Sequence, residues 1–490
     1  MTINVLFLSA EADPFVKIGG LGDVAGALPN AIHHLSERAD GLNSVDIRMV
    51  LPFHYAIKQK GFQTKFLGEF IVPSKNDRIP CQVYLFEQGD FPVYFLDGAP
   101  IDENSPVYSL DPIHDGHKFV FFSLASLGLV EFLDWRVDIL HANDWHTATA
   151  IYAQKSRAMT PVNLAATKTL YTLHNLPFMG YGAQQALTDF GLPPTTNPTL
   201  PEWARHTPLP MGLLYADKIV AVSPHYAEEI LTPEFGCGLE DFLKTRKSVI
   251  TGILNGLDTD KWDPENDPEI VRNFSLESID KRNQNKKHLQ KEFHLPISDD
   301  TPLLTLISRM DPQKGIDIAL KGLAEIEDLP WQAIILGTGI PHVEQMARSL
   351  KERYPERVRS VIDFDNKLAH QLYAGADMFL MPSRYEPCGL SQMIAMRYGC
   401  VPIARATGGL ANTIQHVSKR VDGGTGFLFT PPYPSVFAYT LKRAINLYRQ
   451  DPNKWKQIQQ NGMMCDFSWE KPAQKYIDLY NILISQQEGH

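Results

Sequence analysis

The chain has 490 residues, of which 44% are hydrophobic and 21% charged, with a formal net charge of 46 − 56 = −10. This length exceeds one ordinary core and predicts two or three domains, while the composition is that of a globular protein in water. The negative charge disfavours general nucleic-acid binding, and the absence of an apolar run of about 18 residues predicts no membrane span.

The five cysteines are scattered and form no C-x-x-C pair. The sequence therefore indicates neither a disulfide framework nor a zinc site. The N-terminus lacks a basic stretch followed by an apolar one, as a secretory signal would have. We expect a cytosolic protein, or a plastid protein whose transit peptide has been removed.

Strand-like segments alternate with helical ones along the first half of the chain, and such alternation predicts a parallel sheet wrapped by helices. The predicted strands are Ile3–Ser9, Val45–Pro52, Phe91–Asp97, Val137–Asn143, Thr167–His174 and Asp217–Ser223.

A glycine-rich segment with Lys17 follows the first predicted strand and precedes a helix predicted over Asp23–Leu35. Glycines 19, 20 and 22 allow a positive φ and a close approach of backbone N–H groups to a ligand, and a helix N-terminus favours an anion. The segment predicts a phosphate or sugar-phosphate site. A tight turn without a ligand is an equal alternative, because the glycine order fits neither G-x-G-x-x-G nor the P-loop.

The pattern of apolar strands and helices restarts in the second half, as in a second doubly wound sheet. The predicted strands are Thr301–Arg309, Trp331–Gly339, Ala376–Ser383 and Cys400–Arg405, and the predicted helices are Gly315–Glu327, His342–Arg353, Lys367–Ala374 and Gly389–Tyr398. We assign an N-terminal domain to residues 1–250, a C-terminal domain to 251–465, and a helix that packs back on the N-terminal domain to 466–490. Ligands are expected beyond the carboxyl ends of the strands, in a cleft that the two domains share.

A basic stretch, Lys281–Lys291, has no interleaved aromatic residues. Leu289 and Phe293 give it an apolar edge with i, i+4 spacing, so we predict a helix with a solvated charged face. Nucleic-acid binding is the less favoured alternative.

Charged and glycine residues follow the strands of the second half. Arg309 and Lys314 come after the first of these strands, where two cations suit a diphosphate; an ordinary loop with a charged helix start is the alternative. Glu386 is placed to accept hydrogen bonds from a sugar hydroxyl. The amides of Cys388, Gly389 and Leu390 are expected to point at an anion.

Three further features bear on the chemistry. A nucleophilic role for Cys388 is disfavoured, because no paired base is evident. Gly408 and Gly409 predict another close backbone approach to a phosphate. His174 and Asn175 are placed to bond sugar hydroxyls, although a hydrogen-bonded core histidine is an equal alternative for His174.

Several long motifs occur in order, namely KIGGLGDVAGALP, HANDWHT, YTLHNLPFMGYG, VSPHYAEEILTPEFGCGLEDFL, ILNGLDTDKWDP, SRMDPQKGID, YAGADMFLMPSRYEPCGL and ATGGL. From Ile3 to about Tyr480 the chain resembles the bacterial glycogen synthase and plant starch synthase family. The resemblance implies an α/β GT-B fold with two Rossmann-like domains. It also implies transfer of glucose from a nucleotide sugar, usually ADP-glucose, to the non-reducing end of an α-1,4-glucan, with retention of configuration and without a metal or other cofactor.

The resemblance also assigns roles to single residues. The catalytic residues it implies are Glu386, Lys314, Arg309, His174 and Lys17. The donor-binding residues are Lys17, Arg309, Lys314 and Glu386, together with Gly19, Gly20, Asp23, Asn175, Asn255, Cys388, Gly389, Leu390, Thr407, Gly408 and Gly409. The resemblance also places Asp144, Trp145 and His146 on the acceptor side.

The chain departs from the family pattern at four positions. Ser391 replaces the usual Thr, Asn412 replaces Asp and removes a charge, and Cys400 stands where Thr or Ala is common. Ile394 stands where the wider class often has a second glutamate, which disfavours a sucrose-type synthase that uses UDP-glucose. An inactive glucan-binding homologue is disfavoured because Lys17, Lys314 and Glu386 are all present.

No motif offers a clear carboxylate nucleophile, so front-face transfer is favoured over double displacement. The choice between a glycogen and a starch product, and the oligomeric state, stay open; a monomer fits the sequence.

Overall fold

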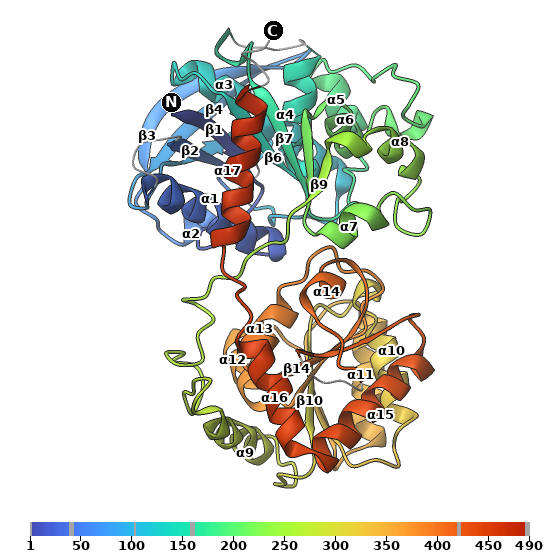
Figure 1. The fold of residues 1–490 in the computed structure, drawn as a ribbon. Helices are drawn as coiled ribbons and strands as arrows, with labels where there is room; N and C mark the ends of the chain where they lie inside the picture. Colours follow the sequence, from blue (N-terminus) through green and yellow to red (C-terminus); the bar gives the residue numbers. More distant parts are fainter. Residues whose placement is uncertain (1, 39–43, 102–103, 157–161, 419–422, 486–490) are drawn as a thin grey trace. The chain divides into compact units, whose positions relative to one another are not determined.

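The computed structural model describes residues 2–38, 44–101, 104–156, 162–418 and 423–485. The chain divides into two compact units (Figure 1), of which the first is Met1–Gly256 with Trp469–His490 and the second is Leu257–Ser468. The division thus lies a few residues beyond the position 250/251 that we assigned from the sequence, and the chain returns to the first unit at Trp469.

The first unit contains a sheet in the order β3-β4-β5-β2-β1-β6-β7-β8-β9. Its strands are β1 (Ile3–Leu8), β2 (Val45–Pro52), β3 (Lys65–Pro73), β4 (Arg78–Phe86), β5 (Val93–Asp97), β6 (Ile139–Asn143), β7 (Lys168–Leu173), β8 (Lys218–Ala221) and β9 (Ile250–Gly252). Every pair from β5 to β9 is parallel, as predicted. The expectation of a wholly parallel sheet is wrong at one edge, because β3 and β4 form an antiparallel hairpin beside β5.

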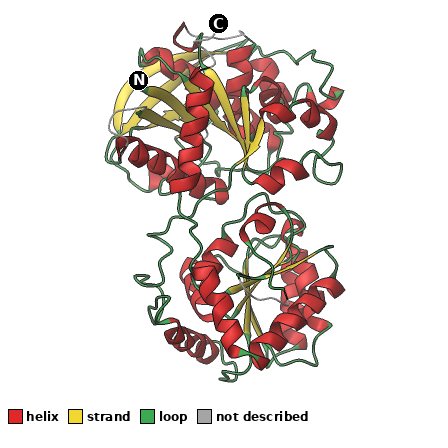
Figure 2. Cartoon of the chain, in the orientation of Figure 1, coloured by secondary structure: helices red, strands yellow, loops and turns green. Residues whose placement is uncertain are grey.

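Helices cover the first sheet (Figure 2). They are α1 (Gly20–Arg38), α2 (Tyr55–Gln59), α3 (Pro112–Phe132), α4 (Trp145–Lys155), α5 (Gln184–Asp189), α6 (Pro208–Tyr215), α7 (Pro224–Glu229), α8 (Glu240–Thr245) and α17 (Glu470–Ser485). The chain's last helix, α17, packs along α1 (Figure 1). The Tyr480 hydroxyl lies 2.7 Å from Nδ1 of His141, which ties α17 to strand β6.

The glycine-rich segment differs from its prediction. Helix α1 begins at Gly20 rather than Asp23, and none of Gly19, Gly20 and Gly22 has a positive φ. A Cβ on Gly22 would lie 3.0 Å from Oε2 of Glu11 and 3.1 Å from Cγ of Lys17. Close packing, rather than a left-handed backbone, therefore accounts for glycine at this position.

The second unit contains a fully parallel sheet in the order β12-β11-β10-β13-β14-β15. Its strands are β10 (Leu303–Ile307), β11 (Gln332–Leu336), β12 (Val358–Val361), β13 (Met378–Met381), β14 (Val401–Arg405) and β15 (Phe427–Phe429). Its helices are α9 (Arg282–Glu292), α10 (Ile316–Ala324), α11 (Pro341–Arg353), α12 (Asn366–Gly375), α13 (Ser391–Arg397), α14 (Gly408–Thr413), α15 (Pro434–Gln450) and α16 (Pro452–Met463).

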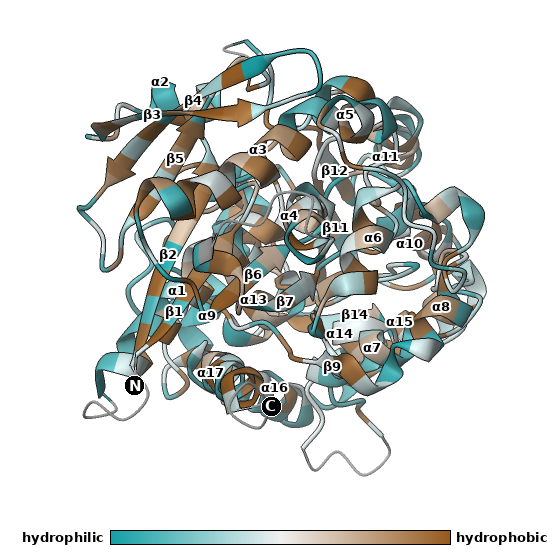
Figure 3. Ribbon diagram, turned by 90° about the horizontal axis from the view of Figure 1, so that it is seen from above, coloured by the Kyte–Doolittle hydropathy of each residue, from teal (hydrophilic) through white to brown (hydrophobic). Residues whose placement is uncertain are grey.

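Apolar side chains fill the cores. The ribbon in Figure 3 is brown at hydrophobic residues along strands such as β2 and β5, where alternate or successive residues are buried. No helix among the described residues is long and apolar enough to cross a membrane. The cellular location stays a prediction.

The basic helix α9 has the predicted solvated face, with Lys287 and Lys291 exposed, but two of its basic residues are buried, which the sequence analysis did not anticipate. The side chains of Arg282 and Lys286 are only 6% and 4% exposed. Lys286 Nζ lies 2.9 Å from Oδ2 of Asp377 and 2.7 Å from the hydroxyl of Tyr448. Arg282 donates to the carbonyl oxygen of Tyr398. Long basic side chains bury their stems in apolar surroundings, so charge alone did not reveal the buried face.

Replacement of Lys286 by Ala is expected to lower the free energy of unfolding by about 3 kcal/mol, because a buried carboxylate loses its main partner. Thermal unfolding followed by circular dichroism measures this. The matched control is Lys287→Ala, since Lys287 is largely exposed and pairs with Asp299 at 3.2 Å; this change is expected to cost under about 1 kcal/mol. Equal effects of the two changes would contradict the buried pair.

Candidate functional site

The carboxyl ends of β10, β13 and β14 form one edge of the second sheet, since these strands are parallel neighbours. The loops after them carry Lys314, Glu386 and the pair Gly408–Gly409. The structure brings two of the predicted residues into direct contact, because Lys314 Nζ lies 2.9 and 2.8 Å from the two carboxylate oxygens of Glu386. The hydroxyl of Ser383 donates to the same carboxylate at 3.0 Å.

The position of Lys314 depends on two local features. The Asp311 carboxylate accepts the backbone N–H of Lys314 at 3.2 Å and caps the short turn Pro312–Lys314. Gly315 has a φ of +63°, and a Cβ there would lie 2.1 Å from the carbonyl oxygen of Pro382. Only glycine therefore lets the Lys314 turn approach the end of β13.

Arg309 lies on the same edge and is more exposed than Lys314. Its guanidinium lies 3.4 Å from Asp311, and 57% of its side chain is accessible to solvent. Sequence reasoning missed a neighbouring ion pair, in which Arg384 donates to both carboxylate oxygens of Asp317 at 2.8 and 2.9 Å. This pair ties the loop after β13 to helix α10.

Gly408 and Gly409 have a structural role that the sequence analysis did not anticipate. A Cβ on Gly408 would lie 2.0 Å from the carbonyl oxygen of Glu386, and one on Gly409 would lie 1.9 Å from that of Cys388. The Gly409 amide donates to the carbonyl oxygen of Glu386 at 3.1 Å, so it is engaged within the chain. These glycines let the loop after β14, which begins at the buried Thr407, pack against the Glu386 loop.

Cys388 and its neighbours lie in the turn that leads into α13. Cys388 is buried, Gly389 has a φ of +73°, and Leu390 directly precedes the helix. The Gln392 side chain donates to the carbonyl oxygens of Cys388 and Gly389 at 3.2 and 2.9 Å. The anion contact predicted for these three amides stays a prediction.

In the first unit, Glu11 holds the segment that carries Lys17, and sequence reasoning missed this residue. The buried Glu11 carboxylate accepts the backbone N–H groups of Ile18 and Gly19 and the hydroxyl of Tyr108. Burial raises the pKa of Glu11, while the two amides oppose that rise. Lys17 itself forms an ion pair with Asp23 at 2.6 Å.

Asp144, predicted on the acceptor side, organises the turn that carries His174 and Asn175. Its Oδ1 accepts the backbone N–H groups of His174 at 2.7 Å and Asn175 at 3.3 Å. Asp144 has a φ of +54°, a conformation that few non-glycine residues adopt. Burial raises its pKa to about 7, against the lowering effect of the two amides.

The His174 ring is a hydrogen-bonded histidine at this sheet edge. Its Nε2 lies 2.9 Å from Oδ1 of Asn143, and burial lowers the pKa of His174 to about 3, so the imidazole is neutral at physiological pH. The side-chain oxygens of Asn175 and Asn255 are buried and have no hydrogen-bond partner among the described residues. Both amides therefore retain acceptor capacity for a ligand.

Trp145 and His146 pack as a pair behind Asp144. Their ring centroids lie 4.5 Å apart, and the His146 ring also contacts Tyr108 at 5.0 Å and Phe119 at 4.6 Å. Burial lowers the pKa of His146. Aromatic packing thus fixes both residues of the predicted acceptor motif.

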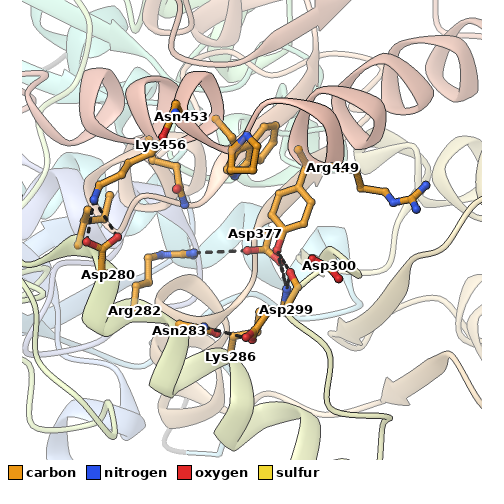
Figure 4. Close-up of a pocket in the computed structure, with 15 residues that line it drawn as sticks. Asp280, Arg282, Asn283, Lys286, Asp299, Asp300, Asp377, Arg449, Asn453 and Lys456 are labelled. Carbon is orange, nitrogen blue, oxygen red and sulfur yellow. Dashed lines mark hydrogen bonds and ion pairs between the residues drawn. The ribbon is translucent and has the colours of Figure 1, made fainter.

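A separate cavity of about 510 Å³ lies in the second unit (Figure 4). Asp377 directly precedes β13, which places it at the amino ends of the strands and therefore at the opposite edge from Glu386. The cavity's lysines are paired within its walls, Lys286 with Asp377 at 2.9 Å and Lys456 with Asp280 at 2.7 Å. It contains none of the predicted site residues.

Within the described part of the chain, no three His, Cys, Asp or Glu residues are grouped so that they could hold a metal ion. The independence from metal that the resemblance implies stays a prediction.

Comparisons with known proteins cover the whole chain. A family model described as the starch synthase catalytic domain matches residues 4–245, and one for group 1 glycosyl transferases matches residues 288–462. The glycogen synthase of Desulforamulus reducens is 39% identical, with 98% of this chain and 99% of the relative covered. The glycogen synthase of Lactobacillus acidophilus is 37% identical, with 98% and 100% covered. The chain belongs to the family of glycogen and starch synthases.

Solved structures agree with this family and with the GT-B fold. The catalytic domain of starch synthase IV from Arabidopsis thaliana, solved with ADP and acarbose, has a TM-score of 0.89 and 29% identity, covering 99% of this chain and 100% of that one. Sucrose-phosphate synthase from Thermosynechococcus elongatus has a TM-score of 0.60 and 19% identity, covering 99% and 100%, and shares the fold alone. The predicted fold and family are confirmed.

Asp144 predicts a pH dependence of stability. Its pKa rises from 3.8 to about 7 on folding, so the folded state binds the extra proton and stability falls as pH increases from about 4 to 7. Asp144→Asn removes this titration. The Tm of the variant minus that of the wild type is therefore expected to increase between pH 5 and 8, as measured by circular dichroism. Parallel Tm profiles for the two proteins would contradict the raised pKa.

Proposed function

We propose that this protein extends an α-1,4-glucan by transferring glucose from ADP-glucose to the non-reducing end, with retention of configuration. The observation that carries the proposal is the Lys314–Glu386 pair at the carboxyl edge of a parallel sheet, in a chain that is similar over its whole length to glycogen synthases. The ADP and acarbose bound to the Arabidopsis starch synthase support a nucleotide-sugar donor and a glucan acceptor.

In the proposed reaction, the acceptor 4-hydroxyl attacks the anomeric carbon while the bond from that carbon to the diphosphate breaks. Arg309 and Lys314 stabilise the negative charge that develops on the departing ADP. The acceptor proton goes to the diphosphate oxygen that leaves, so both substitutions occur on the same face. Glu386 binds donor-sugar hydroxyls and holds Lys314 in place through their contact.

The first unit supplies the remaining assigned residues. In the first unit, Lys17 offers a positive charge to an anionic ligand, with Gly19, Gly20 and Asp23 in the same segment. His174 is neutral at the working pH because burial lowers its pKa to about 3, so it contributes a hydrogen bond or its backbone carbonyl rather than an acidic proton. The free acceptor oxygens of Asn175 and Asn255 suit ligand hydroxyl or amino groups.

A UDP-glucose-dependent synthase of another specificity is the main alternative, and Ile394 disfavours it. Incubation with ADP-glucose or UDP-glucose and maltoheptaose, followed by sizing of the products, tests the proposal. Elongated maltooligosaccharides that form faster with ADP-glucose support it, whereas sucrose-type products or no elongation with either donor would refute it.

Arg309→Ala and Lys314→Ala are each expected to lower kcat/KM for ADP-glucose at least about a hundredfold, or about 3 kcal/mol, because each removes a charge that stabilises the leaving group. Steady-state transfer to maltoheptaose measures this. Lys351→Ala, an exposed lysine of α11, is the matched control. Near-normal kcat/KM values in both site variants would contradict the proposal that Arg309 and Lys314 stabilise the departing diphosphate.

Glucose transfer is expected to survive EDTA, because two cations at the sheet edge take the place of a metal on the diphosphate. The measurement is the initial rate in metal-free buffer with and without EDTA. Loss of turnover that Mg²⁺ or Mn²⁺ restores would count against this part of the proposal.

A further inference from the structure

Large aromatic side chains are exposed on the segment that follows the His174–Asn175 turn. Phe178 and Tyr181 are 51% and 54% exposed, and Trp203, in the short turn Glu202–Ala204, is 37% exposed. The rings of Tyr181 and Trp203 lie 6.2 Å apart, with their planes tilted by 36°. A group of exposed aromatic rings of this kind marks an interaction site more often than chance exposure does.

The backbone holds these rings in place. Gly180 has a φ of +82°, and a Cβ there would lie 2.5 Å from the ring of Trp145. Gly182 has a φ of +96°, and its Cβ would lie 2.7 Å from the carbonyl oxygen of Pro112. Tyr181 thus stands between two glycines that allow close packing. The first of them places Tyr181 directly beside the Asp144–Trp145 motif.

A tight loop lies next to the Trp203 ring. The loop Gly236–Cys237–Gly238 has a positive φ at Cys237 and Gly238, and a Cβ on Gly238 would lie 3.5 Å from the Trp203 ring. Glycine at this position therefore keeps the space beside the Trp203 ring open.

We propose that Tyr181 and Trp203 form a binding site for a segment of the α-1,4-glucan acceptor, an inference that rests on the proposed function. Pyranose rings present apolar C–H faces, which stack on aromatic rings. The tilt between the two rings suits a chain that curves from one sugar to the next. Exposed rings also stack nucleic-acid bases, but the net negative charge of the chain disfavours a phosphate backbone.

The two rings would contact acceptor sugars that lie farther along the chain than the terminal sugar to which glucose is added. Because Gly180 packs on Trp145, the aromatic pair continues from the predicted acceptor residues within the same unit. Long acceptors reach Tyr181 and Trp203, and short ones do not. The inference therefore predicts that the two rings discriminate between acceptors by length.

The test uses the full chain with maltoheptaose and maltotriose as acceptors. Tyr181→Ala and Trp203→Ala are each expected to weaken maltoheptaose binding in titration calorimetry about tenfold, which corresponds to about 1.4 kcal/mol. Their KM for maltoheptaose is expected to increase similarly, with a smaller change for maltotriose and for ADP-glucose. Tyr181→Phe and Trp203→Phe keep a ring and are expected to retain most of the affinity.

The matched control is Phe66→Ala, which removes another exposed ring of the same unit, one that packs on Tyr84 at 5.4 Å. Unchanged maltoheptaose binding in Tyr181→Ala, or an equal loss in Phe66→Ala, would overturn the inference. Tyr181→Ala decides the matter if Trp203→Ala does not fold. Ring-dependent maltoheptaose binding without transfer from any donor would refute the proposed function and leave the glucan site standing. Glucose transfer and maltoheptaose binding that are unchanged in both Tyr181→Ala and Trp203→Ala would refute the glucan site and leave the proposed function standing.

Discussion

The carboxylates of Glu11 and Asp144 each accept two backbone N–H groups from a segment that carries site residues. Both carboxylates follow strands of one parallel sheet, and both are buried, with pKa values raised by that burial. A buried carboxylate needs donors, and a loop at a strand end needs acceptors for its amides. Here the loop amides supply donors to the carboxylates, and the carboxylates supply acceptors to the amides. The segments of Lys17 and of His174 are therefore held by side chains rather than by regular secondary structure.

At the edge of the second sheet, the buried carboxylate is paired with an opposite charge instead of backbone amides. Glu386 is buried, and Lys314 contacts both of its oxygens, so neither charge stands alone. An anionic ligand that draws Lys314 away would leave Glu386 short of a partner. Donor-sugar hydroxyls can then replace the lost hydrogen bonds, since an ionised carboxylate only accepts. In the proposed function, one substrate thus supplies both the anion for Lys314 and the hydroxyls for Glu386.

The sequence was sufficient to predict most of the parallel strands, because strands buried on both faces are continuous apolar runs, but it missed the short strands β9, β12 and β15. The hairpin β3–β4 escaped prediction, since its strands alternate buried and exposed residues with many charges. The buried side of helix α9 escaped prediction, because the burial of Arg282 and Lys286 depends on partners on distant elements. For the same reason, the sequence identified Lys314 and Glu386 as separate site residues but did not predict that they contact each other. Glu11 lies outside the glycine-rich segment it supports, so no local pattern pointed to it.

The glycines show why a local pattern does not fix a role. A Cβ on Gly20 would meet nothing within 4 Å, so this position leaves room for a ligand to approach the start of α1. A Cβ on Gly22 would crowd Glu11 and Lys17, and Cβ atoms on Gly408 and Gly409 would collide with backbone carbonyl oxygens. All four glycines suggest phosphate binding from sequence. Three of them are explained by packing within the chain, whereas packing does not account for glycine at position 20.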